Sequence, residues 1–254
     1  GLPDGVLNVV SGFGHEAGQA LALHPDVEVI TFTGSTRTGK QLLKDAGDSN
    51  MKRVWLEAGG KSANIVFADC PDLQKAVNAT AGGIFYNQGQ VCIAGTRLLL
   101  EESIADEFLT LLKAQAQHWQ PGNPLDPDTT MGMLIDNAHA DNVHSFIRGG
   151  EAKSTLFLDG RKNPWPAAVG PTIFVDVDPA SPLSREEIFG PVLVVTRFKS
   201  EEQALLLAND SDYGLGAAVW TRDLSRAHRM SRRLKAGSVF VNNYNDGDMT
   251  VPFG

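Results

Sequence analysis

The sequence is poor in several features that define large classes of protein. Its 254 residues include only two cysteines, no secretory signal pattern, and no apolar run of the roughly 18 residues that a membrane-spanning helix needs. So few cysteines exclude a disulfide-rich secreted scaffold and indicate a reducing compartment. We therefore expect a cytoplasmic protein that has no membrane partner.

Positive charge is also scarce. There are 22 lysines and arginines against 30 aspartates and glutamates, which gives a formal net charge of -8. Because nucleic-acid binding depends on neutralising phosphates with a positive surface, we expect no nucleic-acid partner. Hydrophobic residues make up 42% of the chain and charged residues 20%, so the composition favours a folded protein over a disordered one.

Three catalytic motifs are missing. The segment Gly34 to Gln41 nearly spells a phosphate-binding loop, but Gln41 occupies the position of the hydroxyl that would bind magnesium. No G-x-S-x-G is present, so a serine-hydrolase elbow is not supported. His139 and His144 are five positions apart, which is off the helical spacing that would bring them together. We expect no metal site.

Strand-like and helix-like segments alternate along the chain. Apolar runs typical of buried strands are separated by amphipathic stretches, an alternation that predicts α/β architecture with a parallel sheet covered by helices. A polar stretch between residues 50 and 55 suggests a boundary, so we expect two domains, 1–54 and 55–254. The predicted strands are 27–33, 53–57, 63–68, 97–100, 172–177, 191–198, 217–220 and 238–242, and the longer predicted helices are 72–85, 104–119, 136–153, 201–209 and 224–235.

The segment Asn87-Gln88-Gly89-Gln90-Val91-Cys92 would present a reactive thiol. Gly89 and Gly95 flank Cys92 and let the backbone bend sharply, so that a small ligand can approach. The uncharged side chains before the cysteine could hold a carbonyl compound, and we therefore consider Cys92 a candidate nucleophile. Cys70 lies between two aspartates that disfavour a thiolate, which indicates a structural residue.

Glu57 is the candidate general base. It ends the apolar run Val54-Trp55-Leu56 and precedes Gly59 and Gly60, the kind of strand end where an α/β sheet displays functional groups. An ion pair with Lys61 or Arg53 explains the same carboxylate equally well.

Two further segments suggest a nucleotide cofactor. Gly34 and Ser35 lie between a predicted strand and a predicted helix, where free N–H groups can bind a pyrophosphate. Before another strand, Glu187 could bind a ribose diol and Phe189 could stack on a flat ring, although a plain loop is the simpler interpretation.

Taken together, these segments resemble the aldehyde dehydrogenase family, over the whole chain and in the same order. Within that family the sequence is most similar to the γ-glutamyl-γ-aminobutyraldehyde dehydrogenases of putrescine breakdown. The matching motifs are Phe32-Thr33-Gly34-Ser35-Thr36-x-x-Gly39, Leu56-Glu57-Ala58-Gly59-Gly60-Lys61-Ser62, Asn87-Gln88-Gly89-Gln90-Val91-Cys92 and Glu186-Glu187-Ile188-Phe189-Gly190-Pro191-Val192.

The resemblance implies a role for each motif. Cys92 would attack an aldehyde, and Glu57 would activate the water that hydrolyses the resulting thioester to a carboxylic acid. The cofactor would be NAD, with NADP possible. The residues that would bind it are Gly34, Ser35, Gly39, the main chain of Ala58, Glu187 and Phe189. His139 stands where the family often has glutamine, so the resemblance assigns it no role.

The resemblance also implies a larger protein. The upstream Asn-Phe-Pro and Lys-Pro-Ser-Glu motifs of the family are not found, and neither is its C-terminal arm, so we expect residues 1–54 to be the end of a Rossmann-like NAD-binding domain and 55–254 a catalytic domain. The parent would be a homo-oligomer, a dimer or a tetramer, and this piece alone would be almost inactive. Asp246 and Asp248 could attract an amine-bearing aldehyde, although a solvated acidic turn is the simpler interpretation.

Two other functions fit the same residues. A thiol enzyme could use Cys92 for acyl transfer or ester cleavage without NAD, and an inactive fragment could keep the fold alone.

Overall fold

The computed structural model describes residues 1–163, 165–247 and 250–254. Contacts divide the chain into two compact units, Gly1–Gly59 and Gly60–Gly254, which we call unit 1 and unit 2. No helix in these described ranges is long and apolar enough to cross a membrane. The predicted assignment of 1–54 and 55–254 to an NAD-binding and a catalytic domain stays a prediction.

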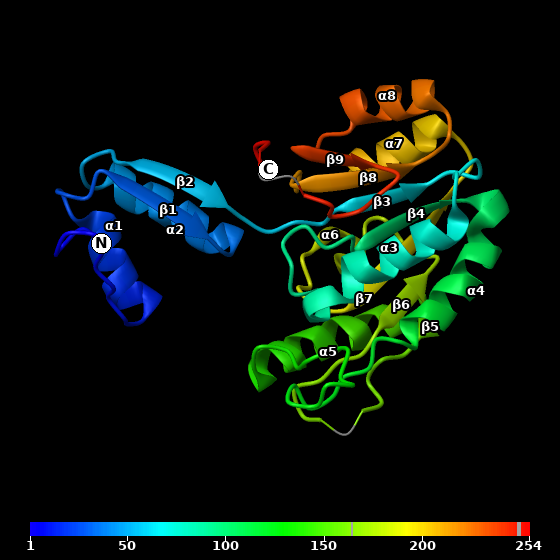
Figure 1. Cartoon of the computed structure of the whole chain (residues 1–254), viewed down its shortest axis with the longest axis horizontal. Coiled ribbons are helices and arrows are strands. Elements are labelled where there is room, and N and C mark those ends of the chain that lie inside the picture. The colour runs from blue at the N-terminus through cyan, green and yellow to red at the C-terminus, as the bar shows by residue number, and fades with distance from the viewer. Residues whose placement is uncertain (164, 248–249) are drawn as a thin grey trace. The chain divides into compact units, whose positions relative to one another are not determined.

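Unit 1 contains a two-stranded parallel sheet and the helix that connects its strands (Figure 1). The connecting helix begins where the Oγ atom of Ser35 accepts a hydrogen bond of 3.2 Å from the N–H of Thr38, so the serine acts as its N-cap. The elements are η1 (Gly14–Gly18), α1 (Gln19–Leu23), β1 (Val29–Thr33), α2 (Thr36–Gly47) and β2 (Arg53–Glu57).

Unit 2 is built on a seven-stranded sheet with the order β5-β6-β7-β4-β3-β8-β9 (Figure 1). All neighbouring strands are parallel except β5, which is antiparallel to β6. The strands are β3 (Ala63–Val66), β4 (Arg97–Glu101), β5 (Thr155–Leu158), β6 (Thr172–Val175), β7 (Val192–Phe198), β8 (Gly216–Trp220) and β9 (Ser238–Val241).

Both faces of this sheet are covered by helices. Alternate residues of β3 point to opposite faces, so Val66 packs in one apolar cluster while Ile65 packs in another. The first cluster lies under α3 and α4, the second under α7 and α8, and a third under α5. The helices are α3 (Leu73–Phe85), α4 (Ala105–Ala116), α5 (Asn137–Glu151), α6 (Pro182–Arg185), α7 (Glu201–Asn209) and α8 (Leu224–Arg233), with the short helices η2 (Tyr86–Gly89) and η3 (Glu102–Ile104).

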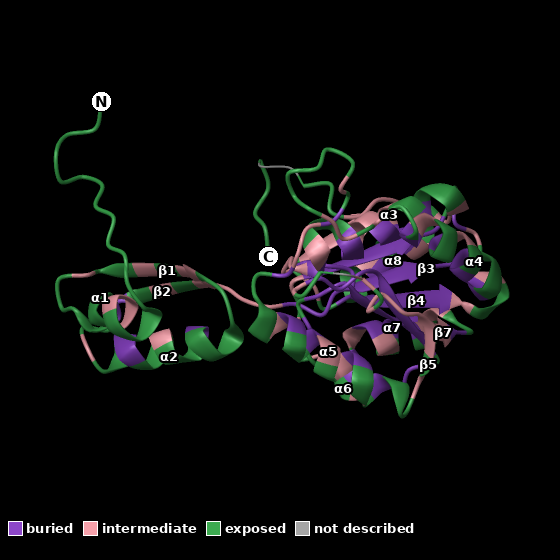
Figure 2. Ribbon diagram, turned by 90° about the horizontal axis from the view of Figure 1, so that it is seen from below, coloured by how far each residue is buried: buried purple, intermediate pink, exposed green. Residues whose placement is uncertain are grey.

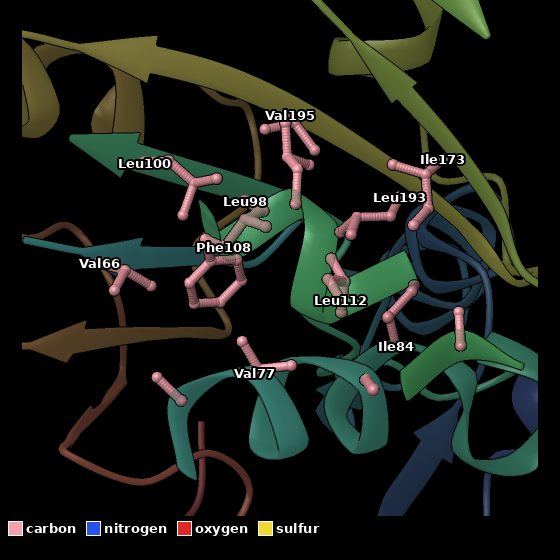
Figure 3. Close-up of a cluster of buried hydrophobic side chains, with 14 of the residues drawn as sticks. Val66, Val77, Ile84, Leu98, Leu100, Phe108, Leu112, Ile173, Leu193 and Val195 are labelled. Atoms are coloured by element: carbon pink, nitrogen blue, oxygen red, sulfur yellow. The ribbon is translucent and has the colours of Figure 1, made fainter. Parts of the chain in front are cut away.

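The largest apolar cluster fixes α3 and α4 against the centre of the sheet. Figure 3 shows Ile84 of α3 and Leu112 of α4 among the side chains that project from the strands. Leu98 and Leu100 of β4 are completely buried in it. Each such side chain contributes about 1.5–3 kcal/mol when it is removed from water. Figure 2 shows the same contrast, with buried strands and exposed outer helix faces. The end of α3, which leads into Cys92, is thereby held rigidly.

Aspartate and serine side chains set the starts of four helices in unit 2. Asp72, Asp136, Ser200 and Asp223 are N-caps, and the carboxylate of Asp136 accepts the N–H of His139 at 2.7 Å. Capping of this kind contributes about 1 kcal/mol per helix. The sequence thus encodes where α3, α5, α7 and α8 begin.

The predicted α/β class is confirmed, with two corrections. The sheet is not entirely parallel, because β5 joins its edge antiparallel to β6, and no strand was predicted at Thr155–Leu158. The predicted helix 104–119 is shorter, since α4 runs from Ala105 to Ala116 after a single 3-10 turn. β5 escaped prediction because it is four residues long and only partly buried, so it has no apolar alternation.

Candidate active site

Cys92 follows a sharply wound turn at the end of α3. Three consecutive residues, Asn87, Gln88 and Gly89, have left-handed φ angles of 49°, 57° and 70°. Left-handed backbone is costly for residues other than glycine, and such strain clusters at functional sites. The amide of Asn87 donates to the carbonyl of Gln90 at 3.0 Å and holds the turn closed. Cys92 itself is partly exposed.

Gly89 must be glycine for a second reason. A Cβ atom at position 89 would lie 2.3 Å from the carbonyl oxygen of Gly190, a distance that real Cβ atoms do not show. The nucleophile motif and the Glu187–Gly190 segment are therefore in direct main-chain contact. The sequence predicted both segments but not their contact.

Gly60 is the point at which three candidate motifs of unit 2 meet. Its N–H donates a hydrogen bond of 2.9 Å to Oε1 of Glu187. A Cβ on the same residue would be 2.1 Å from the carbonyl oxygen of Cys92. Glu187 and the Cys92 turn thus both contact Gly60, although 127 positions separate Gly60 from Glu187.

The Glu187 carboxylate lies in a partly buried environment. Burial raises the pKa of this carboxyl above its usual value, while the N–H of Gly60 and the charge of Lys61 act in the opposite direction. One carboxylate oxygen is engaged by Gly60. A carboxylate has capacity for further hydrogen bonds, so it can also accept hydroxyl groups of a ligand.

Phe189 is held in a left-handed conformation by a histidine from α5. Its φ angle is 56°, and its carbonyl oxygen lies 2.7 Å from Nε2 of His139, which must donate because the carbonyl can only accept. The two rings meet edge to face with centroids 6.3 Å apart. Phe189 is 37% exposed, so part of this residue is accessible to a ligand. No role for His139 was predicted, and the structure places it here.

A buried pair of cations lies behind Gly60. Arg97 donates to the carbonyls of Lys61, Leu207 and Ala208 at 2.8–2.9 Å, so each of its three guanidinium nitrogens binds the main chain. Lys61 is 1% exposed, and within the described ranges its Nζ atom has no hydrogen-bond partner. Burial, and then the charge of Arg97, lowers the pKa of Lys61 to about 7. The amine is therefore poised between its charged and neutral forms near neutral pH.

The remaining predicted site residues belong to unit 1. Glu57 ends β2, and its carbonyl accepts the N–H of Gly34 at 3.0 Å, which joins the end of β2 to the β1–α2 turn. The N–H of Gly39 bonds to the carbonyl of Ser35 at 3.0 Å within the first turn of α2. Ala58 follows Glu57 and is partly buried. The structure thus groups Gly34, Ser35, Gly39 and Glu57 within unit 1, and Cys92, Glu187 and Phe189 within unit 2.

A groove of about 460 Å³ lies beside the β1–α2 turn. Its lining includes Phe32, Arg37 and Thr38, and a Cβ at Gly14 or Gly18, which also line it, would meet nothing within 4 Å. The volume suits a flat heterocycle, and the adjoining N-terminus of the 12-residue helix α2 attracts an anion. These residues fit a dinucleotide, with a ring in the groove and a pyrophosphate at the helix. Gly14 and Gly18 were not predicted to line this groove, because two glycines at this spacing do not by themselves indicate a binding site.

Two other predicted features can be placed. Burial is the main cause that raises the pKa of the Cys70 thiol, and Asp72 and Asp69 add to it, so the predicted direction is right but the predicted cause is secondary. Asp246 is exposed. Asp248 lies outside the described residues.

Comparison with known proteins covers the entire chain. The model of the aldehyde dehydrogenase family matches residues 1–254. The NADP/NAD-dependent aldehyde dehydrogenase PuuC of Escherichia coli strain K12 is 85% identical over 254 residues, which are 100% of this chain and 51% of that protein. The chain spans about half the length of the curated relatives it matches.

Solved structures give the same picture. A crystal structure of an indole-3-acetaldehyde dehydrogenase in complex with NAD+ superimposes with a TM-score of 0.98 at 54% identity, covering 100% of this chain and 52% of that one. The γ-glutamyl-γ-aminobutyraldehyde dehydrogenase of Burkholderia cenocepacia J2315 gives 0.97 at 50% identity, with the same coverage.

Proposed function

Because this chain belongs to the aldehyde dehydrogenase family, we propose that it supplies the nucleophile and the base for NAD(P)-dependent oxidation of an aldehyde to a carboxylic acid. The observation that carries the proposal is the meeting of the Cys92 turn and Glu187 on Gly60. The main chain of Gly60 thus brings together the turn that carries the thiol and a carboxylate that can bind a ribose diol.

Cys92 forms the covalent bond to substrate. Its thiolate adds to the aldehyde carbon and gives a thiohemiacetal, and loss of a hydride from that carbon leaves a thioester on the sulfur. The bound nicotinamide would accept the hydride and so take up the two electrons that the aldehyde loses. The strained turn of Asn87, Gln88 and Gly89 keeps the sulfur in one orientation, which favours a productive approach.

Glu57 releases the product. Its carboxylate takes a proton from a water molecule as the water attacks the thioester carbon, so the carboxylic acid leaves and the thiolate of Cys92 is restored. Only Ala58 and Gly59 separate Glu57 from Gly60 in the chain. The role of Glu57 is supported by this position at the end of β2 and by the motif it shares with the family.

The cofactor-binding residues follow from the same argument. Ser35 and the N-terminus of α2 would hold the pyrophosphate, with Gly34 and Gly39 allowing close approach. Glu187 would bind the nicotinamide ribose, Phe189 would pack on the ring, and the main chain of Ala58 would lie beside it. We propose NAD as the cofactor and NADP as an alternative, since the printed name of the E. coli relative includes both.

The substrate proposed is an amino- or γ-glutamylamino-aldehyde of polyamine catabolism. Support comes from the identity of 85% to PuuC and from the close structural match to a γ-glutamyl-γ-aminobutyraldehyde dehydrogenase. We further propose that the parent protein is cytoplasmic and forms a homo-oligomer, a dimer or tetramer. Light scattering of the full-length parent measures its mass, and a monomer at micromolar concentration would refute that assembly.

The function can be tested in a chimera in which residues 1–254 replace the matching segment of E. coli PuuC. An identity of 85% predicts that this replacement folds. The chimera should reduce NAD when given γ-glutamyl-γ-aminobutyraldehyde, as followed by the absorbance of the reduced nicotinamide. Cys92→Ala should abolish the reaction, whereas Cys70→Ala, the matched control, should keep it. A Cys92→Ala variant as active as the unsubstituted chimera would contradict the proposal.

Glu57→Gln separates the two chemical steps. A single burst of reduced nicotinamide should remain, while steady-state turnover falls by about 10²–10⁴-fold because the general base is lost. An enzyme that uses Cys92 for acyl transfer without NAD would instead cleave an activated ester at full rate and show no nicotinamide signal. A protein with neither activity would be an inactive member of the family.

A further inference from the structure

Tyr244 reaches the nucleophile turn from the far end of the chain. It lies three residues beyond β9, and its hydroxyl donates a hydrogen bond of 2.7 Å to the carbonyl oxygen of Ile93, the residue after Cys92. The two residues are 151 positions apart. The distance is that of a normal hydrogen bond, so a segment far away in the chain holds the nucleophile turn in place.

Two glycines form a slot for the Tyr244 ring. A Cβ on Gly83 of α3 would lie 2.7 Å from the ring, and a Cβ on Gly95 would lie 2.9 Å from it. The N–H of Gly95 also donates to the carbonyl of Gly83 at 3.0 Å, so the walls of the slot are joined to each other. Any side chain at either position would displace the ring. The slot therefore determines where the Tyr244 hydroxyl points.

The hydroxyl stays a donor under working conditions. Burial raises the pKa of the Tyr244 phenol above its ordinary value, so the group remains protonated throughout the neutral range. The ring also packs near Phe240 of β9, with centroids 5.8 Å apart. Tyr244 is thus anchored to the edge strand of the sheet as well as to the nucleophile turn.

Two consecutive carbonyls of the nucleophile turn are then held by different parts of the chain. Gly60 lies against the carbonyl of Cys92, and Tyr244 binds the carbonyl of Ile93. Within the turn, the N–H of Ala94 bonds to the carbonyl of Val91 at 3.0 Å. With both carbonyls fixed, the two peptide planes that follow Cys92 cannot rotate freely.

We propose that Tyr244 is a positioning residue that sets the orientation of Cys92 through the carbonyl of Ile93. The proposal rests on the proposed function of Cys92 as the nucleophile. Asn245, Asp246 and Gly247 follow Tyr244 directly and line a groove of about 570 Å³ with β9. Tyr244 consequently couples this surface segment to the reactive thiol.

Alkylation of Cys92 by iodoacetamide tests the proposal on the 254-residue chain without aldehyde or cofactor. Cys70→Ala leaves one thiol. In that background Tyr244→Phe keeps the ring but removes the donor, and the rate constant should fall several-fold, because a thiol that is no longer held in one orientation meets the reagent less often in a reactive geometry. The difference should persist at alkaline pH, where every thiol is ionised, because the orientation of the thiol has changed and not its ionisation. Tyr86→Phe, at a tyrosine that is 62% exposed, is the matched control.

Gly83→Ala tests the position of the Tyr244 ring in a second way. It keeps the hydroxyl but pushes the ring out of its slot, so it should reproduce the Tyr244→Phe profile. Gly82→Ala changes the preceding residue of α3, where a Cβ meets nothing within 4 Å, and should leave alkylation unchanged. In the chimera, Tyr244→Phe should lower kcat roughly 10- to 100-fold with little change in the KM for NAD.

Three results would overturn the proposal. They are a Tyr244→Phe profile that overlays the control at every pH, alkylation that becomes faster at every pH, and a loss of thermal stability with normal alkylation. The last two would indicate a barrier to access and a purely structural tyrosine. Failure of the proposed function is separate, since an inactive chimera would leave the alkylation profile of the chain unaffected.

Discussion

Gly60 lies so close to the main chain of Cys92 that a Cβ at position 60 would be 2.1 Å from the Cys92 carbonyl oxygen. The contact involves backbone on one side, so no flexible side chain can move aside to make room. Space for even one methyl group would require the nucleophile turn to shift as a unit.

Gly60→Ala should therefore impair catalysis more than folding. We expect the chimera to lose at least about 10²-fold in kcat, because a displacement near 1 Å of a reacting group costs that much. Initial rates and thermal unfolding of the same preparation measure the two effects. Gly149→Ala, which adds a methyl in open space on α5, is the control and should keep normal rates. Full activity in Gly60→Ala would show that the nucleophile turn can shift without loss of catalysis.

His139→Ala should weaken cofactor binding. Loss of the hydrogen bond to the Phe189 carbonyl releases a left-handed residue, and one hydrogen bond of about 0.5–1.5 kcal/mol corresponds to a roughly 2- to 12-fold rise in the KM for NAD. Titration calorimetry of NAD with the chimera gives an independent measure. His139→Gln retains an N–H donor and should bind almost normally, so equal weakening in both variants would contradict the explanation.

Lys61→Met should stabilise unit 2 in a pH-dependent manner. The pKa of Lys61 is lowered from 10.5 to about 7, so between these values the unfolded chain binds more protons than the folded one, and stability rises with pH. Methionine removes the cost of deprotonating the amine. The variant should thus gain up to a few kcal/mol near pH 7, and the gain should shrink as pH approaches 10.

Urea unfolding of the chain at several pH values measures this difference. Lys75→Met changes an exposed lysine of α3 and should show no pH-dependent gain over the parent. A stability difference between Lys61→Met and the parent that is constant from pH 7 to 10 would mean that Lys61 has an ordinary pKa in the fold.

Asp246→Asn should reduce the preference for amine-bearing aldehydes. An exposed carboxylate contributes only about 0.2–1 kcal/mol to an ion pair, so kcat/KM for an amino aldehyde relative to an uncharged one should fall about 1.5- to 5-fold. The effect should vanish at 1 M salt, where screening extends over about 3 Å. Asp128→Asn, an exposed residue on another loop, serves as the control. An unchanged ratio in low salt would eliminate electrostatic steering by Asp246.

The sequence was sufficient for elements whose signal is local. Apolar runs predicted β3, β4 and β7, and amphipathic stretches predicted the helices 72–85 and 136–153, which correspond to α3 and α5. Glycines around Cys92 predicted a turn there, and the turn is tighter than expected because Asn87 and Gln88 also adopt left-handed backbone. No local sequence pattern predicts a left-handed conformation for a glutamine.

The parts that escaped prediction depend on residues far apart in the chain. Gly60 contacts Glu187 across 127 positions, and Tyr244 contacts Ile93 across 151. A glycine that is required by an approaching carbonyl looks the same in the sequence as one required by a turn. Likewise, His139 shows nothing in its own segment that points to Phe189, and only the packing of α5 brings the two together.

The position of β3 between β4 and β8 has a consequence for how the molecule is made. The amide oxygen of Asn64 in β3 accepts the indole N–H of Trp220 in β8, 156 positions later, so one side of this interior strand has no partner until most of the chain exists. At ribosomal rates of about 5–20 residues per second, this interval lasts roughly 8–30 s. An apolar strand with an open edge is prone to aggregate during that time. Protection by a chaperone would therefore matter most before β8 emerges, and slower synthesis after β4 would lower the yield of folded protein.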